Sequence, residues 1–219
     1  SRRYELLGWA SKNENHYIIE DEYDSELRLS GQPIPTLQSI DVSDKVIYMN
    51  TFTKTLSSTV RISYMILPGQ LLDEFYKKLS FYSCTVSNFE QYTLAKFIQE
   101  GYFEKHINRL RNYYHSKRDT LITAIRSSRL NESVTISGEE AGVHFLMEIN
   151  TSQPEETLIQ SALTQGIRLS PLSAYYHIPQ EAPDNVYIMN YSSIEIDNIK
   201  EIIQKLSQCI YSSSIKYCN

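Results

Sequence analysis

The apolar residues of this chain change their spacing along the sequence, from the period of a helix to the period of a strand and back. Short runs rich in β-branched residues occur at residues 17–19, 46–49 and 61–67, and longer segments carry apolar residues three or four positions apart. Strands that alternate with helices indicate a sheet covered by its connecting helices. The spacing therefore predicts an α/β protein.

The same spacing predicts where the individual elements lie. A loop over residues 24–44 is long enough to suggest a functional role. Gly101 permits a break in the helical stretch that runs to about residue 130, and we place a domain boundary within residues 105–130. The further helices are expected around residues 6–10, 155–164 and 199–210, and the further strands at residues 143–149, 167–169 and 186–189.

Composition excludes several classes of function. The chain has 219 residues, and 21 Lys and Arg against 26 Asp and Glu give a net charge of −5, so no net basic field is available for direct binding of nucleic acid. Its seven glycines form neither a G-x-G-x-x-G nor a P-loop motif. The three cysteines lack the spacing of a disulfide framework or a metal site, which predicts no metal and favours a reducing cytoplasm. No apolar run is long enough to predict a membrane helix.

Two short segments concentrate the residues that can do chemistry. Asp21 and Tyr23 follow a predicted buried strand, and their spacing places both side chains on one face of extended backbone. Lys54 lies in the loop after another strand, together with Thr51 and Arg61. Each residue alone has an ordinary structural explanation, such as a solvated surface lysine or a turn-forming aspartate. Together, an acid, a phenol, an amine and a guanidinium at the ends of sheet strands match the needs of pyridoxal phosphate.

The motifs around these residues resemble those of a known family. The run E-D-x-Y-D-S-E-x-R over residues 20–28 and the run T-F-T-K-T-L over residues 51–56, followed by Arg61, resemble the aminotransferase-like domain of MocR-type regulators of the GntR family. That domain is similar to fold-type I aminotransferases of class I/II. Residues 97–114 and segments of the last third, from Gly142 to Tyr176, extend the resemblance over nearly the whole chain.

The resemblance implies a fold and a division into domains. We expect residues 1–115 to be part of the large domain of a fold-type I PLP-dependent transferase, with a mainly parallel sheet and covering helices. Residues 116–219 would form the smaller α+β C-terminal subdomain.

The resemblance also implies a role for each site residue. Lys54 would form a Schiff base with pyridoxal phosphate, and Asp21 would pair with the pyridinium nitrogen. Tyr23 would donate a hydrogen bond to the ring's phenolate oxygen. Arg61 and Thr51 would bind the phosphate, the arginine through its fork of N–H donors.

The chain departs from the family pattern at informative positions. Asn50 stands where a glycine often precedes the lysine motif. Residues 186–194 contain no arginine for a substrate carboxylate, and Arg168 is the nearest substitute. This departure argues against full transamination by this chain.

The family's chains are also longer than this one, and their DNA-binding winged helix precedes the point where this chain begins. We therefore expect a C-terminal fragment whose contact with DNA runs only through a missing N-terminal domain.

The function implied by the resemblance is that of a cytoplasmic effector domain in a transcriptional regulator. It would form a homodimer and sense an amine or amino acid through pyridoxal phosphate. A free class I/II aminotransferase, which transfers an amino group between an amino acid and a 2-oxo acid, is the alternative. A module that binds no cofactor and serves only for dimer contacts is a third possibility.

Basic residues are frequent on the long predicted helix. Their frequency predicts a solvated helix face, with a contact to another subunit or to a DNA-binding domain as the alternative. The residues concerned are Lys105, His106, Arg109, Arg111, His115, Lys117 and Arg118.

Overall fold

The computed structural model describes residues 2–22, 25–29, 34–140 and 142–211. The chain divides into two units, residues 1–109 and residues 110–219, each of which is described by itself. The division falls within the long helix α5 (Tyr102–Arg126). The domain ranges 1–115 and 116–219 stay a prediction.

Unit 1 contains helices and a small sheet. Its helices are α1 (Arg2–Ala10), α2 (Leu37–Ile40), α3 (Gly69–Leu79), α4 (Asn88–Gln99) and the first turns of α5. Its strands are β1 (Ile18–Glu22), β2 (Val46–Thr51) and β3 (Ser63–Ile66). The three strands predicted in this part of the sequence are therefore confirmed, each within a few residues.

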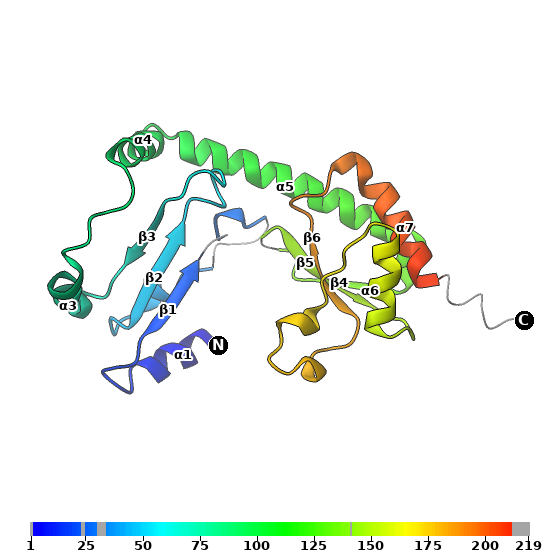
Figure 1. Cartoon of the computed structure of the whole chain (residues 1–219), viewed down its shortest axis with the longest axis horizontal. Helices are drawn as coiled ribbons and strands as arrows, with labels where there is room; N and C mark the ends of the chain where they lie inside the picture. Colours follow the sequence, from blue (N-terminus) through cyan, green and yellow to red (C-terminus); the bar gives the residue numbers. More distant parts are fainter. Residues whose placement is uncertain (1, 23–24, 30–33, 141, 212–219) are drawn as a thin grey trace, which may run out of the picture. The chain divides into compact units, whose positions relative to one another are not determined.

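The sheet of unit 1 has the order β1-β2-β3 (Figure 1). Strands β1 and β2 are parallel, and Glu22 pairs with Asn50 near the carboxyl ends of both. Strands β2 and β3 are antiparallel, and Thr51 pairs with Ser63. The carboxyl ends of β1 and β2 and the amino end of β3 therefore meet at one edge of the sheet.

One face of this sheet is buried, and Glu20 fixes a helix against it. The Glu20 carboxylate accepts hydrogen bonds from the backbone N–H groups of Leu37 (2.6 Å) and Gln38 (2.9 Å). These groups belong to the first turn of α2, where helix N–H groups lack partners within the helix. On the same face Val46 and Tyr48 are 3% and 8% exposed, whereas Met49 on the other face is 36% exposed.

The helical stretch after β3 consists of three helices. The Ser87 side chain accepts a hydrogen bond from the N–H of Glu90 and thereby begins α4. Gly101, with φ +74°, separates α4 from α5, as its position predicts. Neither α3 nor α4 buries a residue, so the predicted apolar face of α4 lies on the surface of unit 1.

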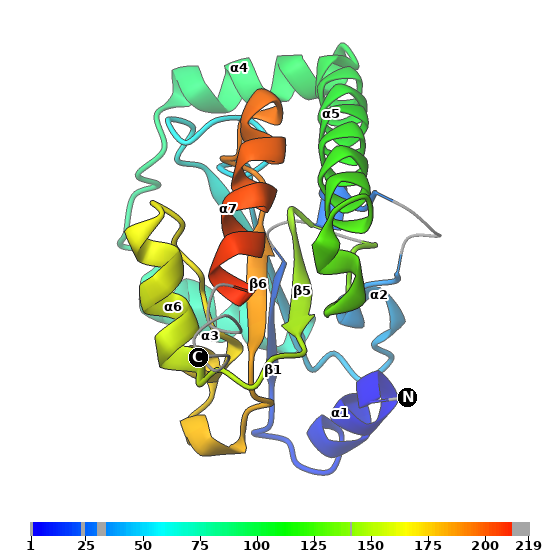
Figure 2. The ribbon, with the colours of Figure 1, turned by 90° about the vertical axis from the view of Figure 1, so that its right-hand side faces the viewer.

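Unit 2 has helices on one face of an antiparallel sheet (Figures 1 and 2). The strands β4 (Val134–Ser137), β5 (His144–Ile149) and β6 (Val186–Asn190) pair in that order. The helices on this face are α6 (Glu155–Thr164), α7 (Ile199–Tyr211) and the later turns of α5. Strand β4 is absent from the sequence prediction, although its four residues alternate apolar and polar side chains with the period of a strand.

The strand predicted at residues 167–169 is wrong. The segment is irregular, and only its following residues approach the sheet, where the Ser170 carbonyl accepts a hydrogen bond from the N–H of Ile188 (2.8 Å). Pro171 then forms a single bridge with Tyr187. Because proline has no N–H to donate, the pairing does not continue into a strand.

The predicted solvated face of α5 is wrong at two of its residues. Lys117 is 2% exposed, and its Nζ donates a hydrogen bond to the carbonyl oxygen of Ser192 (2.9 Å). Arg118 is 8% exposed and donates from Nη1 to the carbonyl oxygen of Glu139 (3.0 Å). These cations hold loops of unit 2, because a buried charge requires hydrogen-bond partners.

Within the described part of the chain, no helix has the length and apolar character that a membrane span requires.

The core of unit 2 comes from alternate residues of the strands and from one stripe of each helix. The large apolar side chains of unit 2 that are almost completely buried are Leu121, Ile125, Leu130, Phe145, Met147, Ile149, Leu158, Tyr187, Tyr191, Ile199 and Leu206.

Candidate functional site

Three of the predicted site residues lie at the same edge of the unit 1 sheet. Asp21 is the residue before the last of β1, and Lys54 follows the end of β2 by three positions. Arg61 precedes β3 by two positions. The register of the strands brings these segments to one edge, and all three side chains are exposed. Ligands of parallel sheets bind at such an edge.

A single helical turn carries Lys54. The N–H of Leu56 donates to the carbonyl oxygen of Phe52 (2.9 Å), which closes the turn around the lysine. The N–H of Phe52 donates to the carbonyl oxygen of Ile62 (2.9 Å), and the Thr53 hydroxyl donates to that of Val60 (2.8 Å). These bonds hold the lysine-bearing segment against the start of β3.

The Thr51 hydroxyl takes part in the same loop. It lies 3.2 Å from the carbonyl oxygen of Ile62 and 3.1 Å from the Thr53 hydroxyl, and it accepts a hydrogen bond from the Thr53 N–H (3.3 Å). A hydroxyl has one proton to donate. To bind a phosphate, Thr51 would exchange its bond within the loop for a bond to the phosphate, and this role stays a prediction.

A polar network beneath the sheet edge explains Asn50, which stands where the family often has glycine. Its Nδ2 donates to the Tyr48 hydroxyl (2.9 Å) and to Glu26 Oε1 (3.2 Å), and its Oδ1 accepts from the Thr51 N–H (2.6 Å). The pKa of Tyr64 is raised to about 12, mainly by burial and to a smaller extent by the neighbouring Tyr48 and Glu26. Asn50 thus holds the end of β2 at the point where the chain turns toward the lysine.

Helix α5 contacts the lysine-bearing turn at two points. The Phe103 ring packs edge-on against the Phe52 ring, with centroids 5.8 Å apart. The His106 Nε2 lies 2.8 Å from the carbonyl oxygen of Thr55. Sequence reasoning assigned His106 to a solvated face, although its spacing of three residues from Phe103 places both on one side of a helix.

Two other predicted residues are not joined to this edge by the structure. Tyr23 lies outside the described residues. Arg168 belongs to unit 2, where its side chain is exposed. The proposed roles of both residues stay predictions.

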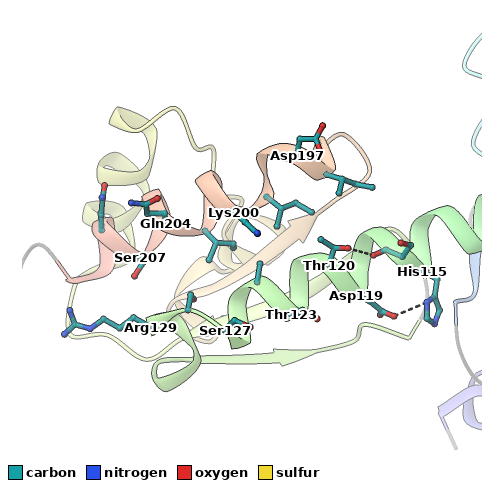
Figure 3. A pocket seen from close by; sticks show the side chains of 17 residues that line it. His115, Asp119, Thr120, Thr123, Ser127, Arg129, Asp197, Lys200, Gln204 and Ser207 are labelled. Carbon is teal, nitrogen blue, oxygen red and sulfur yellow. Dashed lines mark hydrogen bonds and ion pairs between the residues drawn. The ribbon is translucent and has the colours of Figure 1, made fainter.

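A separate hollow lies in unit 2 between α5 and α7 (Figure 3). Its volume is about 1340 Å³, and hydroxyl, amide and a few charged side chains line it. His115 Nδ1 and Asp119 Oδ2 pair across one turn of α5 (3.1 Å), and Lys200 projects from α7. None of the motif residues lines this hollow, so it is not the predicted cofactor site.

The chain is similar both to transcriptional regulators and to aminotransferase enzymes. No protein-family model matches the chain. The HTH-type transcriptional regulator YdeL of Bacillus subtilis is 42% identical over 207 residues, which cover 94% of this chain and 44% of YdeL. The probable rhizopine catabolism regulatory protein MocR of Rhizobium meliloti is 37% identical over 87% of this chain and 38% of its own length.

Among solved structures, the kynurenine aminotransferase of Pyrococcus horikoshii superimposes with a TM-score of 0.79. That structure is 27% identical and matches 97% of this chain and 52% of the enzyme. The chain therefore has the fold of the fold-type I PLP-dependent aminotransferases. Its sequence resembles the aminotransferase-like domain of MocR-type transcriptional regulators, as its motifs predict. It spans less than half the length of YdeL and of MocR.

Proposed function

We propose that this chain is the lysine-bearing part of a pyridoxal-phosphate-dependent effector domain in a MocR-type regulator. The observation that carries the proposal is the register of the unit 1 sheet, which gathers Asp21, Lys54 and Arg61 at one edge. The similarity to regulators at 42% and 37% identity favours a regulator over a free aminotransferase.

The side chains at this edge fit the chemical groups of the cofactor. Lys54 supplies an exposed amine for the aldehyde, Asp21 a carboxylate for the ring nitrogen, and Arg61 a planar set of donors for the phosphate. When bound, the cofactor supplies an electron sink and an electrophilic carbon that an amine can attack. Asp21 would keep the ring nitrogen protonated, because a carboxylate favours a neighbouring positive charge.

The ligand and the output follow from the same proposal. The ligand would be an amine or amino acid that competes with the Lys54 amine, and Arg168 would hold its carboxylate. DNA would be contacted by a helix-turn-helix domain in the rest of the protein, which acts in the cytoplasm. Exposed aromatic side chains of unit 1 support a homodimer, since Phe81, Phe89 and Tyr92 are each at least 74% exposed.

Reductive trapping tests the proposal. The protein is equilibrated with pyridoxal phosphate, and borohydride then converts a carbon–nitrogen double bond between a lysine and the cofactor into a stable single bond. We expect peptide mass spectrometry to find the phosphopyridoxyl group on Lys54. Lys54→Arg keeps the positive charge but removes the reactive amine, so labelling should disappear.

The matched control is Lys12→Arg, which alters another exposed lysine of unit 1. It should leave labelling of Lys54 unchanged. Equal labelling of many lysines in the wild-type protein, or retention of the label elsewhere in Lys54→Arg, would contradict the proposal. Formation of many equivalents of a 2-oxo acid from an added amino acid, with a second 2-oxo acid present to accept the amino groups, would support the free aminotransferase instead.

A further inference from the structure

His106 is placed to hold the residue that follows Lys54. Its Nε2 lies 2.8 Å from the carbonyl oxygen of Thr55, which is 51 residues away in the sequence. A carbonyl oxygen has no proton, so Nε2 must be the donor in this hydrogen bond. The bond therefore requires a proton on Nε2.

The same side of α5 also holds the residue on the other side of the lysine. Phe103, one helical turn before His106, packs edge-on against Phe52 at 5.8 Å between centroids. Phe52 precedes Lys54 by two positions, and Thr55 follows it by one. The lysine-bearing turn is thus attached to α5 on both sides of the lysine, by an aromatic contact and by a hydrogen bond.

The far part of this loop lies beside an open pocket. Leu56, Val60 and Ile62 border an open pocket of about 370 Å³, which Phe97 of α4 and His106 also line. Thr55 itself is completely buried, so its carbonyl oxygen is removed from water. Without a hydrogen-bond donor, this buried oxygen would destabilise the folded protein. The His106 bond is consequently a polar contact that ties the turn to α5 and satisfies this buried oxygen.

We propose that His106 is a positioning residue, which fixes the direction of the Lys54 amine by holding the Thr55 carbonyl. The inference rests on the proposed role of Lys54. His106 acts through the backbone of the turn and does not itself contact the cofactor. Loss of its N–H donor removes one of the contacts that hold the turn, and the amine then spends less time in the orientation that reacts with the aldehyde.

Two substitutions of His106 distinguish the effect of its Nε2 hydrogen-bond donor from the effect of removing the imidazole ring. In His106→Gln the side-chain amide nitrogen takes the place of Nε2, whereas in His106→Asn it takes the place of Nδ1 and cannot reach Thr55. We expect His106→Gln to retain the wild-type affinity for pyridoxal phosphate. We expect His106→Asn to weaken it roughly three- to tenfold, the effect of one hydrogen bond, and to shift the pH midpoint of the bound cofactor's absorbance.

His115→Asn is the matched control, because it changes a histidine of the same helix whose Nδ1 pairs with Asp119 in unit 2. It should leave both readouts unchanged. Equal affinity and equal pH midpoint in the wild type, His106→Gln and His106→Asn would overturn the role of His106 while labelling of Lys54 persisted. Absence of any labelling at Lys54 in the wild type would overturn the proposed function and this inference together.

Discussion

The surroundings of three lysines show how contacts decide what a lysine does. Lys45 is 7% exposed, and its Nζ donates to the carbonyl oxygen of Glu14 (2.7 Å) and lies 4.7 Å from the centre of the Tyr17 ring. Lys117 is buried in a comparable way, between a carbonyl oxygen and an aromatic ring. Lys54 is exposed at a sheet edge. The first two ammonium groups stabilise loops, and the third is accessible to a ligand.

Removal of the Lys117 ammonium should therefore destabilise the protein. In Lys117→Met the carbonyl oxygen of Ser192 loses its donor, and we expect the free energy of unfolding to fall by about 1–2 kcal/mol. Urea unfolding measures this change. The control Lys12→Met alters an exposed lysine and should change the value by less than about 0.5 kcal/mol. A Lys117→Met variant as stable as the wild type would show that the buried ammonium contributes nothing to stability.

At the scale of elements, the lysine-bearing turn depends on neighbours on both sides. The start of β3 holds it through the loop carbonyls of Val60 and Ile62, and α5 holds it through Phe103 and His106. The position of α5 depends in turn on the break at Gly101, where the chain leaves α4 with a positive φ. The geometry of the site is thus set partly by a glycine that contacts none of its residues.

Two glycine substitutions should change stability in opposite directions. Gly101 has φ +74°, so Gly101→Ala forces an alanine into the left-handed region and should cost about 1–2 kcal/mol. Gly8 lies within α1, where an added methyl group would meet no other atom within 4 Å, so Gly8→Ala should stabilise by up to about 1 kcal/mol. Urea unfolding of both variants checks the signs. Equal effects of the two substitutions would contradict the role assigned to the backbone at Gly101.

At the scale of the whole molecule, tyrosines range from completely buried to largely exposed. Unit 2 buries Tyr187 and Tyr191 completely, and the Tyr191 hydroxyl donates to the carbonyl oxygen of Gly142 (2.9 Å). Burial raises the pKa of Tyr187 above its ordinary value and raises that of Tyr191 to about 12. Other tyrosines are exposed in both units, among them Tyr92 of unit 1 and Tyr175 of unit 2.

These shifts predict a loss of stability at alkaline pH. A tyrosine whose pKa is higher in the folded protein than in the unfolded chain favours folding below pH about 10, the unfolded value. That contribution should decline as the pH rises from about 10 toward 12, because the unfolded chain releases its proton first. Tyr191→Phe should reduce this decline while lowering stability at neutral pH. Urea unfolding at several pH values measures both effects, and a pH-independent difference would contradict the assignment.

Much of the fold follows from patterns that are local in sequence. The apolar spacing of residues 199–210 predicts α7, and the β-branched runs predict β1, β2 and β3, because the side-chain periods of helices and strands differ. The segment at residues 167–169 alternates apolar and polar residues as a strand does but remains irregular, because Pro171 stops the pairing with β6. Lys117 and Arg118 resemble solvated cations in sequence, since their carbonyl partners are distant in the chain.

The sequence by itself determined the α/β class, the positions of most elements and the choice of Asp21, Lys54 and Arg61 as candidate site residues. Residue type and spacing carry this information, because chemistry and periodicity are properties of short segments. The tertiary structure alone decided that the strand register brings those segments to one edge and that His106 holds the carbonyl of Thr55. Contacts between residues 51 positions apart depend on how the elements pack, which no local pattern records.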